Sequence, residues 1–496
     1  MDEAALQRLR SAFDPERFRQ QGHDLVDRLA DYLGAALTRQ AGPVLPWVDP
    51  EGQLGNTPSI SEDAGPEVPE IVGDLLHRAF HLHDPRTLGH QDGLPVPAAS
   101  LAGLLISTLN NDPSVYETGP AVVPIEVRLL RWMCDELGFP GDAGGVLTGG
   151  GSLGNLTALL AARQAKVGRD SWTEGNRPGE ALCVLVSEQA HYCVARAVKI
   201  MGWGDDGFVK VPVTDDFRMD VAALPGALAR AREAGRRPIA VVASACTTAT
   251  GTFDPLPEIA DFCSEHDLWM HVDGAHGAST VLSPQYRSRV RGIERADSVV
   301  WDCHKMMMTP AVLTGVLFRN ARHSYDTFRQ EATYLFEERP DEEWYNPGNR
   351  TVECTRSGMA VLLYTALRVH GIGLFRDYVT RCFDVARSLS DLIDASPDFE
   401  LAVEPDANIV CFRYRADPGI DSDRLQSRLR QKLVSGGSFY LTEAELDGNQ
   451  FLRCTAQNPF TGEQDLCDLL DHLRAEASAL EERSGTTNAS GLAQEG

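Results

Sequence analysis

Long apolar runs and positive charge are both scarce in this chain. In its 496 residues, no run approaches the roughly 20 apolar residues that a membrane-spanning helix needs. The first residues, MDEAA, have neither the basic start nor the apolar core of a signal peptide. The formal net charge of −25 repels the phosphates of nucleic acids and of anionic membranes. We therefore expect a soluble protein with neither nucleic acid nor membrane as a partner.

Paired cysteines are also missing. The eleven cysteines are scattered from Cys134 to Cys467, and none forms a C-x-x-C pair. That pattern fits neither a disulfide framework nor a zinc ribbon, so we expect reduced thiols and a cytoplasmic location. Cys303 could be read as a nucleophile, but no base is assigned to it, and a small buried filler is the favoured interpretation.

A lysine and an aspartate carry the first chemical signal. Lys305 ends the stretch DCHK just past the apolar run 298–301, and Asp273 lies upstream in HVDGAH (271–276). A lysine amine can hold the aldehyde of pyridoxal phosphate as a Schiff base, and a carboxylate can keep the pyridine nitrogen protonated. Alone the two residues indicate little, because many lysines follow a strand and many His-x-Asp triplets end one.

Short apolar runs alternate with helical stretches between about residues 140 and 318. The runs are 182–186, 239–243, 268–272, 298–301 and 313–318. Runs that are apolar on both faces are typical of a mostly parallel sheet covered by helices. Asp273 and Lys305 then follow the carboxyl ends of strands, where open α/β sheets place their ligand crevice.

The whole chain is predicted to have four parts. An amphipathic helix is expected over 14–39 and an extended connection over 42–65. Further strands are expected at 408–414 and 451–454. The parts are an N-terminal helical arm with its connection (1–85), a large α/β domain (86–373), a small α+β domain (374–480) and a disordered tail (481–496).

A glycine-rich stretch, TGGGSLGNL (148–156), precedes a strong helix former. Its glycines let the backbone approach a phosphate, Ser152 can cap the helix, and the helix N-terminus offers free N–H groups. The glycines also match the dinucleotide fingerprint, but the strand before them is short. Asp170 matches only loosely the acid that this fingerprint requires about 20 positions on. Dinucleotide binding is therefore the weaker interpretation, and a plain glycine turn stays open.

Histidines beside these motifs allow other interpretations. His191 follows the run 182–186, where an imidazole can stack on a cofactor ring, although a capping or core histidine is the commoner role. His271, His276 and His304 could suggest a metal, but they form no i,i+4 helical pair and have no C-x-x-C companion. We predict no metal site.

Five motifs in order resemble those of the group II pyridoxal-phosphate-dependent amino acid decarboxylases, which include aromatic L-amino acid, glutamate, histidine and diaminobutyrate enzymes. They are GGGSLGN (149–155), SEQAH (187–191), TT (247–248), HVDGA (271–275) and DCHK (302–305). The resemblance covers about residues 70–475. It implies a fold-type I enzyme with a mostly parallel central sheet covered by helices, a smaller C-terminal α+β domain, and a homodimer with active sites at the subunit interface.

The resemblance implies a role for each matching residue around the cofactor, pyridoxal 5'-phosphate. Lys305 would form the internal aldimine, Asp273 would pair with the pyridinium, and His191 would stack on the ring. The other residues expected to contact the cofactor are Gly151, Ser152, Thr247, Ala275 and His304.

Substrate residues follow from the same resemblance. Tyr334, in a stretch (327–335) similar to the family's mobile loop, would protonate the carbanion after CO2 leaves. Arg453 resembles the arginine that binds the substrate α-carboxylate in glutamate decarboxylases. His90 lies in the region that lines the substrate end of related pockets, although its contact cannot be derived from the sequence.

Two departures from the family pattern stand out. Asp302 and Cys303 occupy positions where the family often has Asn-Pro, so a neutral donor becomes a potential anion. We do not expect Asp302 to touch the phosphate unprotonated. The stretch SLGN (152–155) replaces the usual SEAN and resembles the diaminobutyrate-type branch more than the aromatic one. Neither departure removes a catalytic group.

The predicted function is α-decarboxylation of an L-amino acid to its amine and CO2. One alternative is oxidative decarboxylation to an aldehyde, against which Tyr334 argues; another is a non-catalytic homologue that acts by interaction, against which Lys305, Asp273 and His191 argue. The substrate is not identified. Residues 337–343 carry five acids against one arginine. They form either a solvated loop or a field that favours cationic substrates.

Overall fold

The computed structural model describes residues 2–62, 65–328 and 344–491, with side chains as far as residue 480. Two compact units are present: unit 1 contains residues 1–90, 396–400 and 413–496, and unit 2 contains 91–395 and 401–412. These boundaries differ from the predicted ones at 85 and 373. The long helix α14 (Ala360–Asp394) carries unit 2 past residue 373, and the pattern change seen there reflects a kink at Gly371, whose φ is +72°.

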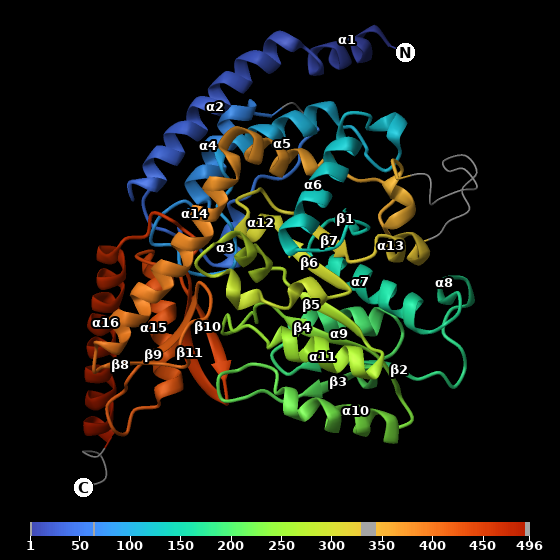
Figure 1. Cartoon of the computed structure of the whole chain (residues 1–496). Helices are drawn as coiled ribbons and strands as arrows, with labels where there is room; N and C mark the ends of the chain where they lie inside the picture. Colours follow the sequence, from blue (N-terminus) through green and yellow to red (C-terminus); the bar gives the residue numbers. More distant parts are fainter. Residues whose placement is uncertain (1, 63–64, 329–343, 492–496) are drawn as a thin grey trace. The chain divides into compact units, whose positions relative to one another are not determined.

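Unit 2 is built on one seven-stranded sheet with the strand order β1-β7-β6-β5-β4-β2-β3 (Figure 1). Only β7 runs antiparallel to its neighbours, and the other pairings are parallel. The strands are β1 (Gly144–Thr148), β2 (Leu182–Ser187), β3 (Phe208–Val211), β4 (Arg237–Ser244), β5 (Trp269–Asp273), β6 (Ser298–Asp302) and β7 (Thr314–Phe318). All five apolar runs predicted as strands are confirmed, and the short strand expected before the glycine-rich stretch is β1. Strand β3 was missed.

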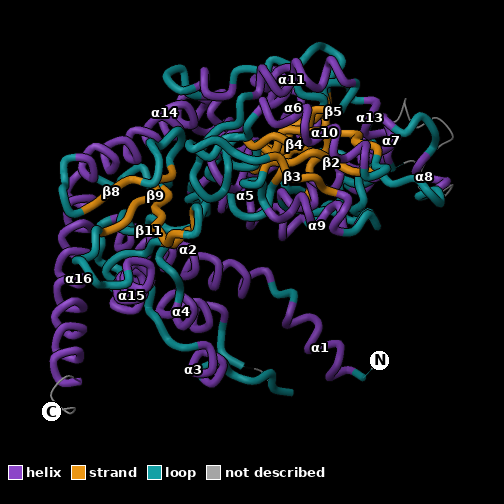
Figure 2. Tube along the Cα trace, turned by 90° about the horizontal axis from the view of Figure 1, so that it is seen from below, coloured by secondary structure: helices purple, strands orange, loops and turns teal. Residues whose placement is uncertain are grey.

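Helices cover both faces of this sheet (Figure 2). The side chain of Leu185 packs into one core cluster, while those of Val184 and Val186 pack into the other, as alternation along a strand requires. The first cluster includes residues of α6 (Val122–Leu137), α10 (Leu224–Glu233), α11 (Leu256–His266) and α14, and the second includes residues of α7 (Gly151–Lys166) and α9 (Tyr192–Ile200). Burial on both faces explains the continuous apolar runs of the sequence.

Of the remaining described helices of unit 2, all except α5 are short. They are α5 (Pro97–Leu109), α8 (Ser171–Glu174), α12 (Cys303–Met306) and α13 (Arg322–Thr327). Helix α12, which carries Lys305, begins directly where β6 ends. Among the described residues, no helix is long and apolar enough to cross a membrane.

Unit 1 begins with α1 (Glu3–Ala12) and α2 (Pro15–Leu37), the second of which confirms the predicted amphipathic helix. Asp14 caps α2 by accepting a hydrogen bond from the Glu16 N–H at 2.9 Å. The extended connection predicted over 42–65 is wrong in part, because α3 (Pro50–Gly55) forms within it. Asp49 caps this helix at the Gly52 N–H, and Pro50 occupies its first turn.

The C-terminal part of the chain holds a second, four-stranded sheet in the order β10-β11-β9-β8. Its strands are β8 (Phe399–Leu401), β9 (Ile409–Tyr414), β10 (Thr442–Leu446) and β11 (Asn449–Thr455), and the other helices of unit 1 are α4 (Val68–Arg78), α15 (Ser422–Gly436) and α16 (Glu463–Gly491). Because α16 reaches Gly491, residues 481–491 are helical rather than disordered as predicted. The stretch EER (481–483) consists of good helix formers, which continue the preceding helix.

Candidate active site

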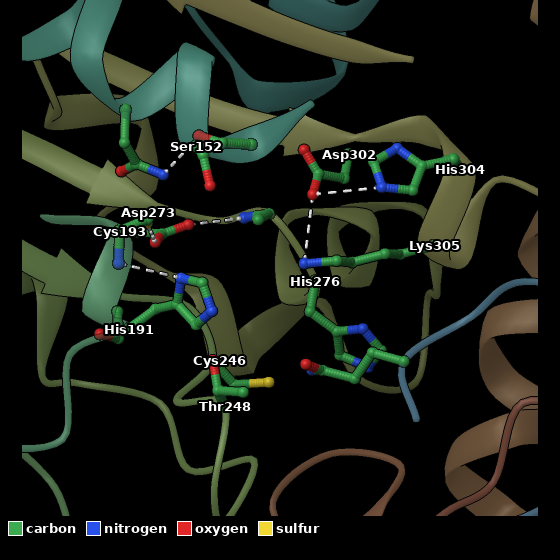
Figure 3. A pocket seen from close by; sticks show the side chains of 15 residues that line it. Ser152, His191, Cys193, Cys246, Thr248, Asp273, His276, Asp302, His304 and Lys305 are labelled. Atoms are coloured by element: carbon green, nitrogen blue, oxygen red, sulfur yellow. Dashed lines mark hydrogen bonds and ion pairs between the residues drawn. The ribbon is translucent and has the colours of Figure 1, made fainter. Parts of the chain in front are cut away.

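A cavity of about 200 Å³ lies in unit 2 where β4, β5 and β6 end (Figure 3). Ser244, Asp273 and Asp302, the last residues of these three strands, all line it. Seven residues predicted to contact a cofactor line this one cavity: Gly151, Ser152, His191, Asp273, Ala275, His304 and Lys305. The sheet topology thus gathers residues that are up to 154 positions apart in the sequence at one edge.

Lys305 extends into the cavity from α12, and its Nζ lies 3.1 Å from Oδ2 of Asp302 (Figure 3). Burial works against the charge of the lysine, but the carboxylates of Asp302 and Asp273 outweigh it, so the pKa of Lys305 is raised. The other oxygen of Asp302, Oδ1, accepts a hydrogen bond from the Thr314 hydroxyl at 2.6 Å. His304 stands on the same side, with its Nε2 3.7 Å from Asp302 Oδ2.

Asp273 and His191 face the cavity from neighbouring elements. Asp273 Oδ1 accepts a hydrogen bond from the Ala275 N–H at 3.2 Å, which fixes the carboxylate at the end of β5. His191 precedes α9, and its Nδ1 accepts the Cys193 N–H at 3.4 Å. Burial lowers the pKa of His191, although the charge of Asp273 opposes this. The imidazole is therefore neutral at pH 7, with its proton on Nε2.

The first turn of α7 offers a place for a phosphate. Gly150, with φ +107°, precedes the helix, and no side chain caps its N-terminus. The first N–H groups of the helix are therefore available to an anion. Ser152 lies in the first turn rather than at the cap position that its type suggested. A Cβ atom at Gly151 would come within 2.9 Å of Asp302 Oδ2, so a larger residue here would displace this buried carboxylate.

A buried chain of hydrogen bonds holds this turn against the sheet. His271 bonds through Nε2 to Asn155 Oδ1 at 2.8 Å and through Nδ1 to Ser298 Oγ at 2.9 Å. Trp269 Nε1 donates to the same Ser298 oxygen, and Asn155 Nδ2 donates to the Gly151 carbonyl. Since Ser298 already accepts from Trp269, its hydroxyl can donate to Nδ1, which leaves the His271 proton on Nε2. The network connects the core of β5 to the phosphate turn.

We predict that His271 makes stability fall as the pH drops. Burial lowers its pKa from the usual 6.5 to about 4. Between these two pH values the unfolded chain binds a proton that the folded chain refuses, so the free energy of unfolding decreases as pH falls from 6.5 towards 4. The full loss from this group is about 3 kcal/mol, of which about 2 kcal/mol falls above pH 5. Chemical denaturation at pH 7.5 and pH 5 measures it.

Two variants distinguish the contribution of His271 to the pH dependence of stability from that of the other titratable groups. His271→Gln should show a smaller loss of stability between the two pH values than the wild type. His23→Gln, which changes an exposed histidine of α2, should keep the full loss. Equal pH dependence in wild type and His271→Gln would contradict the assignment.

Three predicted site residues, Thr247, Arg453 and His90, are not among those that line this cavity. The Thr247 hydroxyl hydrogen-bonds to those of Thr250 and Thr252 at 2.8 and 3.1 Å, and its neighbour Thr248 lines the cavity. The contact of Thr247 with the cofactor stays a prediction. Arg453 and His90 belong to unit 1. There Arg453 donates to the Gly89 carbonyl at 3.3 Å, and the ring of His90 lies 5.9 Å from that of Tyr440. Their predicted roles stay predictions.

Tyr334 and the acidic stretch 337–343 lie outside the described residues. Sequence reasoning also missed some lining residues, which are Gln91, Asn155, Cys193, Ser244, Cys246, Thr248 and His276. The Nε2 atom of Gln91 is buried and has no hydrogen-bond partner within the described part of the chain. In the sequence, the signal that could have identified Gln91 as a site residue was its position directly after His90, which was predicted to lie near the substrate.

The competing interpretations find no support in these contacts. Asp170, the candidate acid of a dinucleotide site, caps α8 at the Trp172 and Thr173 N–H groups. Burial raises the pKa of the Cys303 thiol, so it is a poor nucleophile. His271 is held by Asn155 and Ser298, as described above, which leaves both of its nitrogens engaged.

The residues that converge on the cavity suit pyridoxal phosphate. An amine, a carboxylate, a neutral imidazole and an uncapped helix N-terminus match its aldehyde, its pyridine nitrogen, its ring and its phosphate. The fold and this cavity define a pyridoxal-phosphate-dependent enzyme of fold type I.

Comparison with known proteins identifies the family. Residues 73–415 match the family model described as the pyridoxal-dependent decarboxylase conserved domain. An aromatic-L-amino-acid decarboxylase from Bacillus atrophaeus is 29% identical over 93% of this chain and 95% of its own length. An L-aspartate decarboxylase from Metarhizium robertsii is 30% identical, with 75% of each chain covered. The crystal structure of mouse CSAD in apo form is similar with a TM-score of 0.87 and 26% identity, covering 94% of this chain and 99% of that one.

The chain therefore belongs to the pyridoxal-dependent decarboxylase family, and the predicted resemblance is confirmed. It is a pyridoxal-phosphate-dependent amino acid decarboxylase. Neither oxidative decarboxylation nor a non-catalytic role is favoured. The two curated relatives are named for an aromatic and an acidic substrate. Family membership alone does not identify the amino acid that this enzyme uses.

Proposed function

We propose that Lys305, Asp273, His191 and the first turn of α7 form the catalytic centre of this decarboxylase. The observation that supports the proposal is their convergence on one cavity at the ends of β4, β5 and β6. Lys305 holds the cofactor aldehyde, Asp273 faces the pyridine nitrogen, and the N–H groups beside Gly151 and Ser152 bind the phosphate. When bound, pyridoxal phosphate accepts the electron pair left on the substrate α-carbon as CO2 departs.

The chain's own residues set the conditions for that step. Asp273 supplies a negative charge that favours a proton on the pyridine nitrogen, and the Ala275 N–H keeps the carboxylate in place. His191 offers an uncharged ring, because burial lowers its pKa. A neutral imidazole can stack on an aromatic ring and leaves the positive charge of the site to the pyridine nitrogen. We assign the return of a proton to the α-carbon to Tyr334, and the substrate carboxylate to Arg453.

We propose further that the enzyme works as a homodimer in the cytoplasm. Helix α5 supports the dimer, because its side chains Leu101, Leu104, Leu105 and Leu109 are between 43% and 57% exposed. A monomer gains nothing from a row of exposed leucines, whereas a second copy of the chain would bury them. All eleven cysteines are free thiols, which suits a reducing compartment. Sedimentation analysis at micromolar concentration tests the dimer.

We expect the acidic stretch 337–343 to influence which substrate the enzyme prefers. If its charge reaches the mouth of the active site, cationic substrates such as lysine or diaminobutyrate are favoured over glutamate and aromatic amino acids. The preference should weaken at high salt, because ions screen charges separated by more than about 8 Å at physiological strength. Measuring kcat/KM for the four substrates at low and high salt tests this.

A clear preference for an acidic or aromatic substrate would discard the charge argument. It would leave the decarboxylase assignment intact, because CO2 and an amine would still form. Failure of every amino acid in a broad panel to release CO2 would instead count against the proposed catalytic centre.

A further inference from the structure

The carboxylate of Asp302 occupies an unusual position between the lysine and the phosphate turn. It is the last residue of β6, and only 2% of it is exposed. Both oxygens are engaged: Oδ1 accepts the Thr314 hydroxyl at 2.6 Å, and Oδ2 lies 3.1 Å from Lys305 Nζ (Figure 3). A buried carboxylate is tolerated only when it is paired and hydrogen-bonded. Thr314 and Lys305 supply these two partners.

The backbone of Gly151 packs closely against the carboxylate of Asp302. A Cβ atom at Gly151 would lie 2.9 Å from Oδ2 and 3.1 Å from Oδ1 of Asp302. The carboxylate therefore packs directly under the turn to which we assign the cofactor phosphate. A negative charge next to a phosphate site is unfavourable unless a cation compensates it. Lys305 is the cation in contact with Asp302.

Several ionisable groups face Lys305 from the surrounding elements. Asp302 on β6 and Asp273 on β5 are the carboxylates, and both stabilise the charged amine. Cys193 on α9 influences the pKa of Lys305 less than the two carboxylates do. Its thiol stays protonated because burial raises its pKa. His191 is neutral, because burial lowers its pKa. His304 on α12 lies near Asp302 rather than between it and the lysine. Two carboxylates thus face one amine.

We infer that Asp302 is a positioning residue that holds the Lys305 amine as an ammonium whenever this amine is not bonded to the cofactor. The inference rests on the proposed role of Lys305. A bond between the lysine nitrogen and an aldehyde carbon needs the lone pair of the neutral amine. The ammonium would first release a proton to solvent; a C=N bond would then replace the C=O bond of the aldehyde, and the oxygen would leave as water with the two remaining hydrogens of the amine. Asp302 opposes that first proton loss.

The same contact has a consequence during turnover. When the substrate amine takes the place of Lys305, the released lysine would lie beside Asp302 and take up a proton from solvent. An ammonium cannot attack the carbon it has just left, so the substrate stays bound through its own nitrogen. An asparagine at this position would keep the shape and could still accept the Thr314 hydrogen bond. It would not provide the charge.

The test compares wild-type apoenzyme with Asp302→Asn. Each is treated with pyridoxal, which lacks the phosphate, and with pyridoxal phosphate, and the bond to lysine is trapped by cyanoborohydride at several pH values between 6 and 10. Mass spectrometry of peptides gives the rate at each lysine. We expect Lys305 of Asp302→Asn to react about tenfold faster at pH 7, with its pH profile displaced to lower pH, for both aldehydes.

The chain itself provides internal controls, because it has five lysines, at positions 166, 199, 210, 305 and 432. The rates at the other four should not change. Asp297→Asn is the matched variant: Asp297 precedes β6 at its opposite end, where its carboxylate accepts the Met270 N–H at 2.8 Å. This variant removes a carboxylate without touching the cavity. Its Lys305 profile should equal that of the wild type, and Asp302→Glu should restore part of the wild-type profile.

Each outcome decides the question. An unchanged Lys305 profile in Asp302→Asn overturns the inference. Acceleration with pyridoxal phosphate but not with pyridoxal also overturns it, because that result shows repulsion of the phosphate alone. If Asp302→Asn does not fold, Asp302→Glu, which keeps the charge but moves it relative to Lys305, should displace the profile in the same direction by less. No trapped product at Lys305 in the wild type would instead disprove the proposed role of Lys305.

Discussion

Replacing Lys305 by alanine should abolish decarboxylation and the visible absorption of bound cofactor. Among the described residues that line the cavity, Lys305 alone carries an amine that can hold the aldehyde. We expect the rate of CO2 release to fall by roughly 10⁴ or more, because the covalent attachment that makes the reaction easy is lost. Gas release from the preferred amino acid, together with an absorption spectrum, measures both effects.

Lys199→Ala is the matched control for this variant. Lys199 forms an ion pair with Asp205 at 2.7 Å and does not line the cavity, so its loss should leave rate and spectrum close to those of the wild type. Retained turnover in Lys305→Ala would remove the basis of the proposed catalytic centre.

Asp273→Asn should bind the cofactor and yet turn over slowly. Asparagine can still accept the Ala275 N–H through its Oδ1, so the local structure should survive. Without the negative charge the pyridine nitrogen loses its proton and becomes a poor electron sink. We expect kcat to fall by about 10³, a size typical of losing one essential proton-holding group. Steady-state kinetics and cofactor titration separate rate from binding.

Asp254→Asn makes the same change at a buried carboxylate outside the cavity. Asp254 accepts the Met219 and Ser244 N–H groups, both at 2.7 Å, and burial raises its pKa to about 6. Its substitution should affect stability more than kcat. If Asp254→Asn slowed the reaction as much as Asp273→Asn, the effect would be structural, and the role assigned to Asp273 would be wrong.

Much of unit 2 could be predicted because its strands are buried on both faces. Such strands appear in the sequence as unbroken apolar runs, and β2, β4, β5, β6 and β7 were all found in this way. Strand β3, which was missed, lacks this signature because it includes Lys210. The short helix α3 was missed because it depends on a cap at Asp49 rather than on an apolar stripe.

Site residues that lie at or just after the end of a strand could be predicted from the sequence, whereas those placed by turns or by side-chain contacts could not. Asp273 follows an apolar run, and Lys305 lies just beyond one, so the topology of an open sheet brings them together. Thr247 and Thr248 are neighbours in the sequence, and only the turn that follows β4 decides which of them faces the cavity. The contact between Asp302 and Lys305 depends on the backbone path through α12 and on Thr314 from the next strand. No sequence pattern reports such a contact.

The most direct test of the account is to reduce the loaded wild-type enzyme with borohydride and to locate the fixed cofactor by peptide mass spectrometry. With five lysines in the chain, each candidate attachment site lies on a peptide that can be followed separately. The account predicts that the added mass is found on Lys305 and on no other lysine. Label at Lys166, Lys199, Lys210 or Lys432, or the absence of any label in an enzyme that releases CO2, would contradict it.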